Sequence, residues 1–137
     1  MSTKDIQSFE EFWPFYVREH SKKATRLFHF AGTTTAGVTL LAAIALRRPA
    51  LIPAALVAGY GPAWFSHFFI EKNKPASFKY PLWSFAADWV MWSKILTGKM
   101  DAEVERVMAT ASNGQGHADE ETTAEYTHYQ AGTNGVN

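Results

Sequence analysis

The chain has 137 residues, about the length of one domain, so a single core and a single site are expected. Its 13 basic and 13 acidic side chains give a formal net charge of zero, which argues against a nucleic-acid-binding protein. Because the chain has no cysteine, disulfides, Cys-ligated zinc, iron–sulfur clusters and thiol nucleophiles are all excluded.

The first predicted helix is short and amphipathic. Ser8 opens the Ser-x-x-Glu pattern of a capping box, and an aromatic-rich stretch follows it. Pro14 leaves a second possibility open, in which the regular helix begins near Trp13 with the proline in its first turn. Either helix runs toward His20, and the polar residues 21–23 then form a connection. No removable signal peptide is predicted at this end.

Two long uncharged stretches follow, Leu27–Leu46 and Ala50–Ile70, separated by a turn at residues 47–49. Each would span roughly 30 Å as a helix, the hydrocarbon thickness of a bilayer. We therefore expect an antiparallel pair of membrane-spanning helices; the alternative is a buried helical hairpin in a soluble bundle. Within the second stretch, the Gly-Tyr-Gly-Pro run at residues 59–62 predicts a kink or break, which indicates either a nearby pocket or a packing kink.

The remainder of the chain is less apolar. After a basic loop, Leu82–Leu96 predicts a Trp-rich helix that is too short to span a bilayer comfortably, and Gly98 ends it. Asp101 caps a brief helix that runs to about Ala111. The predicted fold is therefore all-α, a small polytopic membrane helical bundle of about four to five helices. It comprises a membrane domain at residues 1–111 and a polar, disordered tail at residues 112–137.

The predicted hairpin brings candidate metal ligands together. His29 lies near the start of the first stretch, whereas His67 and Glu71 lie at the end of the second, four positions apart on one helical face. His20 approaches the same end. Three imidazoles and a carboxylate without thiolate suit iron, manganese or zinc. Several ionisable groups converging inside membrane helices favour a functional site over isolated capping residues.

Two further features concern the surroundings of this site. Asp88 lies on a hydrophobic helix and is either an acceptor that orients a ligating histidine or a solvent-facing acid. His117 and His128 lie in the polar tail and are excluded from the site. Basic residues gather at the ligand end, whereas the opposite end carries only Arg47 and Arg48. By the positive-inside rule the ligand end faces the cytoplasm.

Several motifs together resemble a known family: Phe12-Trp13-Pro14-Phe15-Tyr16 with Glu19-His20, Arg26-Leu27-Phe28-His29, and His67-Phe-x-x-Glu71-Lys-x-x-Pro75-Ala76. Across roughly residues 8–97 the chain is similar to the small membrane 2-hydroxy fatty acid dioxygenases. The resemblance implies an Fe(II)-dependent enzyme of fatty acid α-oxidation that shortens a 2-hydroxy fatty acid by one carbon. The family's essential histidines fall on His20, His29 and His67, with Glu71 as the accompanying acid, and all four are expected to be catalytic and metal-binding.

The resemblance also implies the partners: a 2-hydroxy fatty acid, dioxygen and membrane lipid, with no nucleic acid. Arg26, Asn73 and Lys74 are candidate substrate-binding residues, of which Arg26 or Lys74 could pair with the substrate carboxylate. For these basic residues, positive-inside topology is the alternative explanation. The expected location is an integral, multi-pass membrane protein, in the inner membrane if bacterial, with its site facing the cytoplasm.

Two competing interpretations remain at this point. A lipid hydroxylase or desaturase would also place a metal site in the membrane, but such enzymes need more histidines to hold two irons. A non-enzymatic membrane scaffold or subunit would use the histidines only to bind one another, backbone or lipid headgroups.

Overall fold

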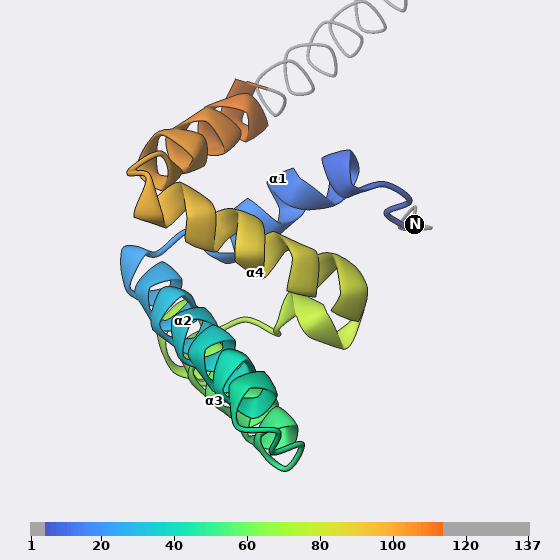
Figure 1. The fold of residues 1–137 in the computed structure, drawn as a ribbon. Helices are drawn as coiled ribbons and strands as arrows, with labels where there is room; N and C mark the ends of the chain where they lie inside the picture. The colour runs from blue at the N-terminus through green and yellow to red at the C-terminus, as the bar shows by residue number, and fades with distance from the viewer. Residues whose placement is uncertain (1–4, 114–137) are drawn as a thin grey trace, which may run out of the picture. The chain divides into compact units, whose positions relative to one another are not determined.

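The computed structural model describes residues 5–113 of the chain. Its described residues are helical or irregular and include no strand, so the predicted all-α fold is confirmed there (Figure 1). The elements are α1 (Phe9–Glu19), α2 (Lys23–Ala45), α3 (Leu51–Ser66), the π-helical η1 (His67–Glu71), the 3₁₀-helical η2 (Ala76–Phe78) and α4 (Pro81–Leu96).

Two compact units make up the chain, residues 1–104 and residues 105–137. The first unit contains all the named elements, and its residues 100–104 are helical as well. In the second unit, residues 105–113 are helical. The helix expected from Asp101 to about Ala111 is therefore present. The tail expected at residues 112–137 lies, from residue 114 onward, outside the described part of the chain.

The capping box at the start of α1 forms as the sequence predicts. The Ser8 hydroxyl accepts a hydrogen bond from the backbone N–H of Glu11 at 3.2 Å, and the Glu11 carboxylate accepts one from the backbone N–H of Gln7 at 3.2 Å. The helix thus begins at Phe9, and Pro14 lies inside it. The alternative start near Trp13 is wrong because the regular α-helix already begins at Phe9, where Ser8 caps the N–H of Glu11, and it continues through Pro14.

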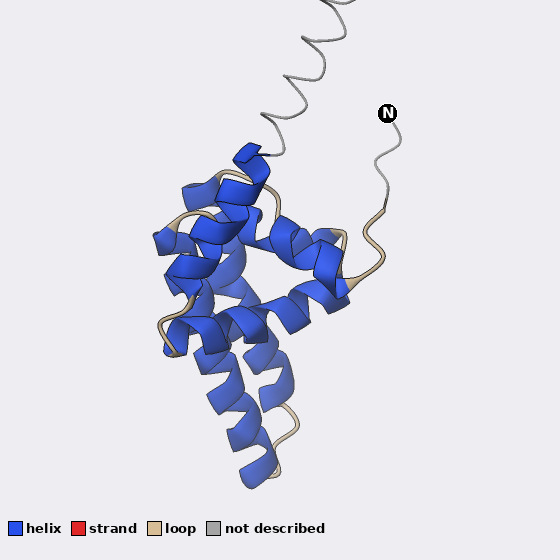
Figure 2. Cartoon of the chain, turned by 90° about the horizontal axis from the view of Figure 1, so that it is seen from above, coloured by secondary structure: helices blue, strands red, loops and turns tan. Residues whose placement is uncertain are grey.

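Helices α2 and α3 form the antiparallel hairpin that the sequence predicts, and they lie side by side in both ribbon views (Figures 1 and 2). Their closest approach involves two glycines. A Cβ atom at Gly32 would lie 2.8 Å from the backbone oxygen of Gly59, closer than real Cβ contacts allow. Small residues at this crossing therefore let the two backbones touch.

Only α2, among the helices of the described residues, is long and apolar enough to cross a membrane. With 16 residues, α3 falls short of the ~17–25 that a spanning helix needs. Length and composition therefore support one of the two spans that the sequence predicts.

Of the kink or break expected at residues 59–62, the break is wrong. α3 continues as an α-helix through Pro62, and the departure from α geometry comes later, at η1. η1 ends where Lys72 adopts the left-handed conformation, with φ of 61°, and the backbone N–H of Asn73 bonds the carbonyl of His67 at 3.0 Å. Single π turns of this kind occur frequently at functional sites.

Helix α4 crosses one end of the hairpin and does not run along its whole length (Figure 1). Its start packs against α1, where the Tyr80 ring contacts Phe12 with ring centroids 5.6 Å apart. Just beyond its end, Asp101 pairs with Arg26 in the first turn of α2, at 3.0 Å. The end of α4 thus lies near the first turn of α2, whereas its start lies beside α1.

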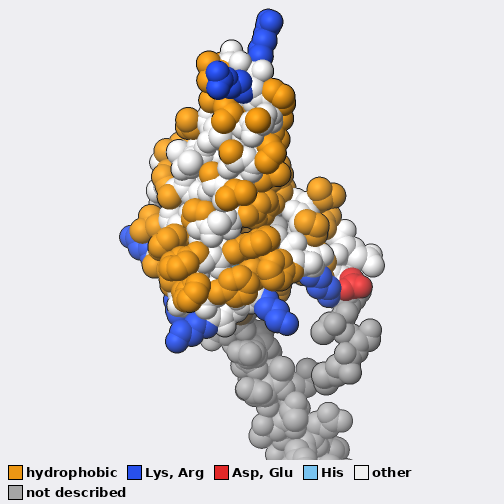
Figure 3. Space-filling model, turned by 90° about the horizontal axis from the view of Figure 1, so that it is seen from below, with side chains coloured by type: hydrophobic (Ala, Val, Ile, Leu, Met, Phe, Trp, Pro, Cys, Tyr) orange, Lys and Arg blue, Asp and Glu red, His pale blue; other side chains and the backbone are white. Residues whose placement is uncertain are grey.

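The core of this unit lies between α1, α4 and that same end of the hairpin. Phe12, Tyr16 and Val17 of α1 are fully buried, as are Ala87 and Met91 of α4. By contrast, α2 and α3 expose large apolar side chains to their surroundings. In Figure 3, apolar side chains cover much of the visible face, with Lys and Arg side chains at its two ends. The exposed apolar side chains include Leu41, Ile44, Val57, Phe65 and Phe69.

Candidate metal centre

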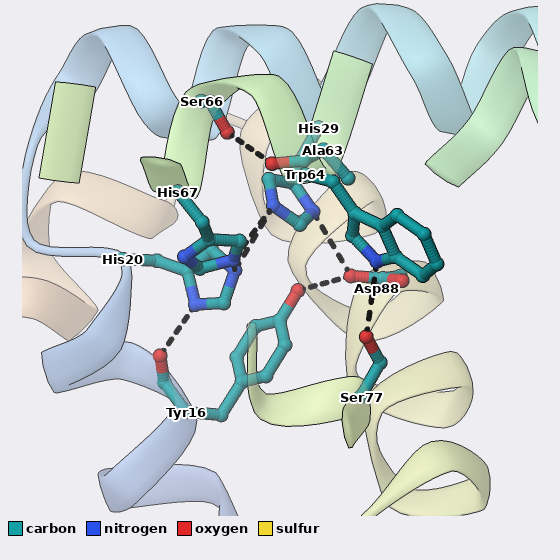
Figure 4. Close-up of polar contacts among 9 residues, drawn as sticks. All are labelled: Tyr16, His20, His29, Ala63, Trp64, Ser66, His67, Ser77 and Asp88. Carbon is teal, nitrogen blue, oxygen red and sulfur yellow. Dashed lines mark hydrogen bonds and ion pairs between the residues drawn. The ribbon is translucent and has the colours of Figure 1, made fainter. Parts of the chain in front are cut away.

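Three histidines from three separate segments meet in the core. The Nε2 atoms of His20 and His29 are 3.1 Å apart, those of His29 and His67 are 3.2 Å apart, and those of His67 and His20 are 3.1 Å apart (Figure 4). All three side chains are buried. The structure therefore brings together the three imidazoles that the sequence selects.

Local structure explains how each histidine reaches this point. His20 caps the C-terminus of α1, and the two residues after it connect directly to α2, so His20 and His29 need not share one helix. His29 lies in the second turn of α2. His67 lies where α3 changes into the π-helical η1. The break at residues 21–22 therefore lets two histidines nine positions apart converge.

Each imidazole has an oxygen partner on its outer nitrogen, Nδ1. Carbonyl, carboxylate and amide oxygens only accept hydrogen bonds, so Nδ1 carries the proton in each ring and Nε2 carries a lone pair. Three lone pairs thus point at one another across 3.1–3.2 Å. The Nδ1 partners are the backbone oxygen of Tyr16 for His20 at 2.6 Å, Asp88 Oδ1 for His29 at 3.1 Å, and Asn73 Oδ1 for His67 at 2.7 Å.

This donor set fits a divalent metal ion. Imidazole nitrogens bind such ions at about 2.0–2.1 Å, which places three nitrogens on one ion about 3.0–3.4 Å from one another. Burial lowers the pKa of His20 well below its usual value, and the neighbouring His29 and His67 lower it further. The imidazole therefore stays neutral, which is the form that ligates a metal. Nitrogen ligands without thiolate suit iron, manganese and zinc alike.

Asp88 lies where an orienting acid would be needed. Its Oδ1 atom accepts hydrogen bonds from His29 Nδ1 and from the phenol of Tyr16 (Figure 4). Burial raises the pKa of Tyr16 well above its usual value, and the charge of Asp88 raises it further, so the phenol keeps its proton. The Tyr16 ring also stacks on His20, with centroids 4.0 Å apart. Asp88 and Tyr16 together connect two of the three histidines.

Glu71 lies outside this group of nitrogens. Its carboxylate accepts a hydrogen bond from the backbone N–H of Lys22 at 2.6 Å and one from the Ser21 hydroxyl at 3.3 Å. Both carboxylate oxygens of Glu71 therefore bind the connection at residues 21–22, and the cluster of possible ligands consists of the three histidines. Glu71 thus fastens η1 to the connection that follows His20.

Of the three candidate substrate-binding residues, Arg26 and Asn73 bind other groups of the protein, and Lys74 lies on the surface. Buried Arg26 donates to the backbone oxygens of His20 and Ser21, at 2.9 and 2.6 Å, and to Asp101 at 3.0 Å. Lys74 is exposed on the surface.

Asn73 uses its amide group within the protein. Besides its bond to His67, Asn73 donates to the carboxylate of Glu19 at 2.8 Å and to the backbone oxygen of Glu19 at 3.1 Å. Burial raises the pKa of Glu19, and the neighbouring Glu71 raises it further. The contacts of Asn73 therefore orient His67. The contacts of Tyr16 with Asp88 and of Asn73 with His67 were not predicted; the one signal for Tyr16 was its position four residues before His20.

Two cavities adjoin the histidines, and both are lined by His29, Tyr60 and Asp88. The smaller, polar cavity is also lined by His20 and His67. The larger one, of about 50 Å³, lies between α2, α3 and α4 and is mostly apolar. Because Gly59 and Tyr60 line the larger cavity, the pocket expected near this run is present although the helix is unbroken there.

Comparison with known proteins gives one informative result. No curated protein and no solved structure matches the chain. The sequence model of one family does match, over residues 6–100, and it is described as 2-hydroxy-palmitic acid dioxygenase Mpo1-like. The matched region contains all three clustered histidines and every element of the first unit from α1 to α4. The chain therefore belongs to the 2-hydroxy-palmitic acid dioxygenase Mpo1-like family.

Proposed function

We propose that this protein is an Fe(II)-dependent membrane dioxygenase that converts a long-chain 2-hydroxy fatty acid into the fatty acid one carbon shorter and carbon dioxide. The observation that carries the proposal is the cluster of three inward-facing Nε2 atoms in a chain of this family. His20, His29 and His67 hold the iron, and Glu71 fixes the connection beside them.

The overall reaction needs no other reactant. A 2-hydroxy acid and dioxygen give the shorter acid, carbon dioxide and water, and the four electrons lost by the substrate are those that dioxygen accepts. Iron, when bound, supplies a centre at which the substrate's oxygen atoms and dioxygen can exchange these electrons. No reductant or second organic substrate enters the balance.

The protein side chains prepare this centre. Asp88 and Asn73 accept the Nδ1 protons of His29 and His67, so these rings are held in the tautomer and orientation that metal binding requires. Tyr16 keeps its phenolic proton and donates a hydrogen bond to Asp88, which stabilises the carboxylate in the core. Burial of all three imidazoles excludes bulk water from the reacting atoms.

The hairpin supports the proposed membrane insertion. Only 17% of the apolar stretch of α2 is buried in the structure, whereas the core helix of a soluble protein is mostly buried. The 16 residues of α3 and the 5 of η1 are consecutive, and together they supply a second helical run long enough to span. The site would face the cytoplasm, because that end carries Lys22, Lys23, Arg26, Lys72, Lys74 and Lys79.

The direct test is conversion of 2-hydroxypalmitate labelled with ¹³C at C1. Detergent-purified protein loaded anaerobically with Fe(II) should, on admission of oxygen, release pentadecanoate and labelled carbon dioxide with matching oxygen uptake. Chelation should abolish the reaction, and re-addition of Fe(II), but not of Zn(II), should restore it. Flat oxygen uptake without pentadecanoate would overturn the proposed function.

A further inference from the structure

Ser84, in the first turn of α4, has a buried hydroxyl group without a partner. The residue is 3% exposed, and its Oγ atom makes no hydrogen bond within the described part of the chain. Thr25 Oγ1 is the only other buried side-chain oxygen or nitrogen in that condition among the described residues. Buried hydroxyls almost always find a partner, since an unpaired one destabilises the fold.

The position of Ser84 suggests what its partner would be. Ser84 lines the polar cavity together with His20, His29 and His67. Thr25 is not among the residues that line that cavity. An unpaired donor at the wall of a cavity beside three metal-ligating nitrogens is placed to bind a polar group of a molecule that enters there.

The adjoining cavity suggests the rest of that molecule. The polar and apolar cavities share His29, Tyr60 and Asp88 in their linings, so they meet at the histidines. From there the apolar cavity extends along the hairpin to Leu40 and Leu56. Leu40 is about 16 Å from His29 along the axis of α2. A ligand with a small polar end and a long apolar tail matches this arrangement.

Three other candidates for the polar end are already engaged. The Arg26 guanidinium donates to two backbone oxygens and to Asp101. The Asn73 side chain bonds His67 and Glu19. Asp88 already accepts from Tyr16 and His29, and its charge would repel an acid. Ser84 therefore remains as a donor at the polar cavity that no protein group uses.

We infer that the Ser84 hydroxyl donates a hydrogen bond to the carboxylate of the acyl substrate, and that the apolar cavity between α2, α3 and α4 holds the first part of its chain. This inference rests on the proposed function, because that function supplies the substrate class. It makes Ser84 a substrate-binding residue, and it explains why the fold keeps a buried hydroxyl unpaired.

The test compares Ser84→Ala with Thr25→Val. Each substitution removes one buried, unpaired hydroxyl with little change in volume, so neither should lower the melting temperature. Binding of 2-hydroxydodecanoate is measured without oxygen on the Fe(II)-loaded protein, by quenching of tryptophan fluorescence. Trp64 lines the polar cavity and Trp89 lines the apolar one, so both can report occupancy.

Loss of a hydrogen bond to an ionised group should raise Kd about 10- to 100-fold in Ser84→Ala. Thr25→Val should bind like the wild type. With 1,2-dodecanediol, which keeps the chain but has no carboxylate, the penalty of Ser84→Ala should shrink to about threefold or less. An unchanged Kd for 2-hydroxydodecanoate in Ser84→Ala would overturn the inference.

A second pair of variants tests whether the apolar cavity holds the acyl chain of the substrate. Ala36 lines the apolar cavity, whereas Ala45 is exposed at the end of α2. Ala36→Leu should weaken binding of 2-hydroxypalmitate more than binding of 2-hydroxyoctanoate, and Ala45→Leu should change neither. Equal effects of Ala36→Leu on both acids would remove the assignment of the apolar cavity.

These outcomes separate the inference from the proposed reaction. Wild-type protein that binds 2-hydroxydodecanoate through Ser84 but forms no shortened acid contradicts the reaction alone. Turnover by the wild type, with equal Kd in Ser84→Ala, contradicts the inference alone. Wild-type protein that binds no 2-hydroxy acid contradicts the assignment of Ser84.

Discussion

Each of the three imidazoles has a different kind of group on its Nδ1 atom. His20 uses a backbone carbonyl, His29 uses the carboxylate of Asp88, and His67 uses the side-chain amide of Asn73. Only the last two can be changed by substitution. Of these two partners only Asp88 can carry a negative charge, so Asp88 and Asn73 are expected to affect metal binding unequally.

Removal of a single clustered imidazole should empty the centre. His67→Ala leaves two nitrogens for an ion that needs at least three protein ligands in an open site. Bound iron in the purified variant should fall to background, and pentadecanoate formation should fall with it. His117→Ala is the matched control, because it removes a histidine that the sequence assigns to the polar tail. Full iron content in His67→Ala would contradict the metal assignment.

Loss of the charge at Asp88 should weaken the metal without abolishing it. Asp88→Asn keeps the shape of the side chain but removes the charge that supports the His29 N–H, so metal affinity should fall about 10- to 100-fold. Competition with a chelator of known affinity measures this change. Asp101→Asn provides the comparison, because Asp101 also forms an ion pair but with Arg26. A wild-type affinity in Asp88→Asn would show that the acid has no part in metal binding.

Two short segments at the end of the hairpin set the geometry of the site: η1 and the connection at residues 21–22. η1 is joined to the connection between α1 and α2 by the Glu71 carboxylate, and also by Lys22, whose ammonium donates to the backbone oxygen of Ile70 at 2.5 Å. These contacts hold the segments that carry His20 and His67 against each other. We therefore expect Glu71 to position His20 and His67 by fixing the backbones of their segments.

A neutral acceptor at position 71 should preserve the metal. Glu71→Gln keeps an oxygen that can accept from the Lys22 N–H, so its iron content should match the wild type. Glu71→Ala removes that acceptor and should lower the free energy of unfolding by about 1 kcal/mol. Iron analysis and thermal melting of both variants check this. Loss of iron in Glu71→Gln would instead identify Glu71 as a ligand.

The close crossing of α2 and α3 can be tested by comparing two glycine substitutions, one at the crossing and one away from it. Gly32→Ala places a Cβ 2.8 Å from the backbone oxygen of Gly59, so the helices must separate, at a cost of about 1–3 kcal/mol. At Gly61 a Cβ would meet nothing within 4 Å, so Gly61→Ala should be neutral or stabilising. Melting temperatures in one detergent measure both. Equal effects of the two variants would contradict the close crossing.

Some features of this fold can be predicted from local sequence patterns, and others cannot. The capping box at Ser8, the hairpin and the convergence of the three histidines follow from local chemistry and helix periodicity. The π turn at residues 67–71 does not, because nothing in His-Phe-Phe-Ile-Glu distinguishes it from α-helix. The bonds from Glu71 to residues 21 and 22 and the unpaired hydroxyl of Ser84 depend on how distant segments pack, which no local pattern in the sequence indicates.

At the scale of the molecule, the path of α4 bears on how the first unit meets a membrane. Its start lies against α1, and the residues just beyond its end lie against the first turn of α2. In Figures 1 and 2, α4 crosses the hairpin at an angle and does not run alongside it to its far end. We therefore expect α4 to lie in the interface, with the metal centre beneath it.

The absence of cysteine makes this topology directly testable, because single cysteines can be introduced at chosen positions. Arg48→Cys marks the turn between α2 and α3, Lys74→Cys marks the loop after η1, and Lys99→Cys marks the end of α4. A membrane-impermeant maleimide should label residue 48 from one face of sealed vesicles and residues 74 and 99 from the other. In inverted vesicles the pattern should reverse. Labelling of residues 48 and 74 from the same face would rule out a spanning hairpin, and labelling of residue 99 together with residue 48 would mean that α4 crosses the membrane.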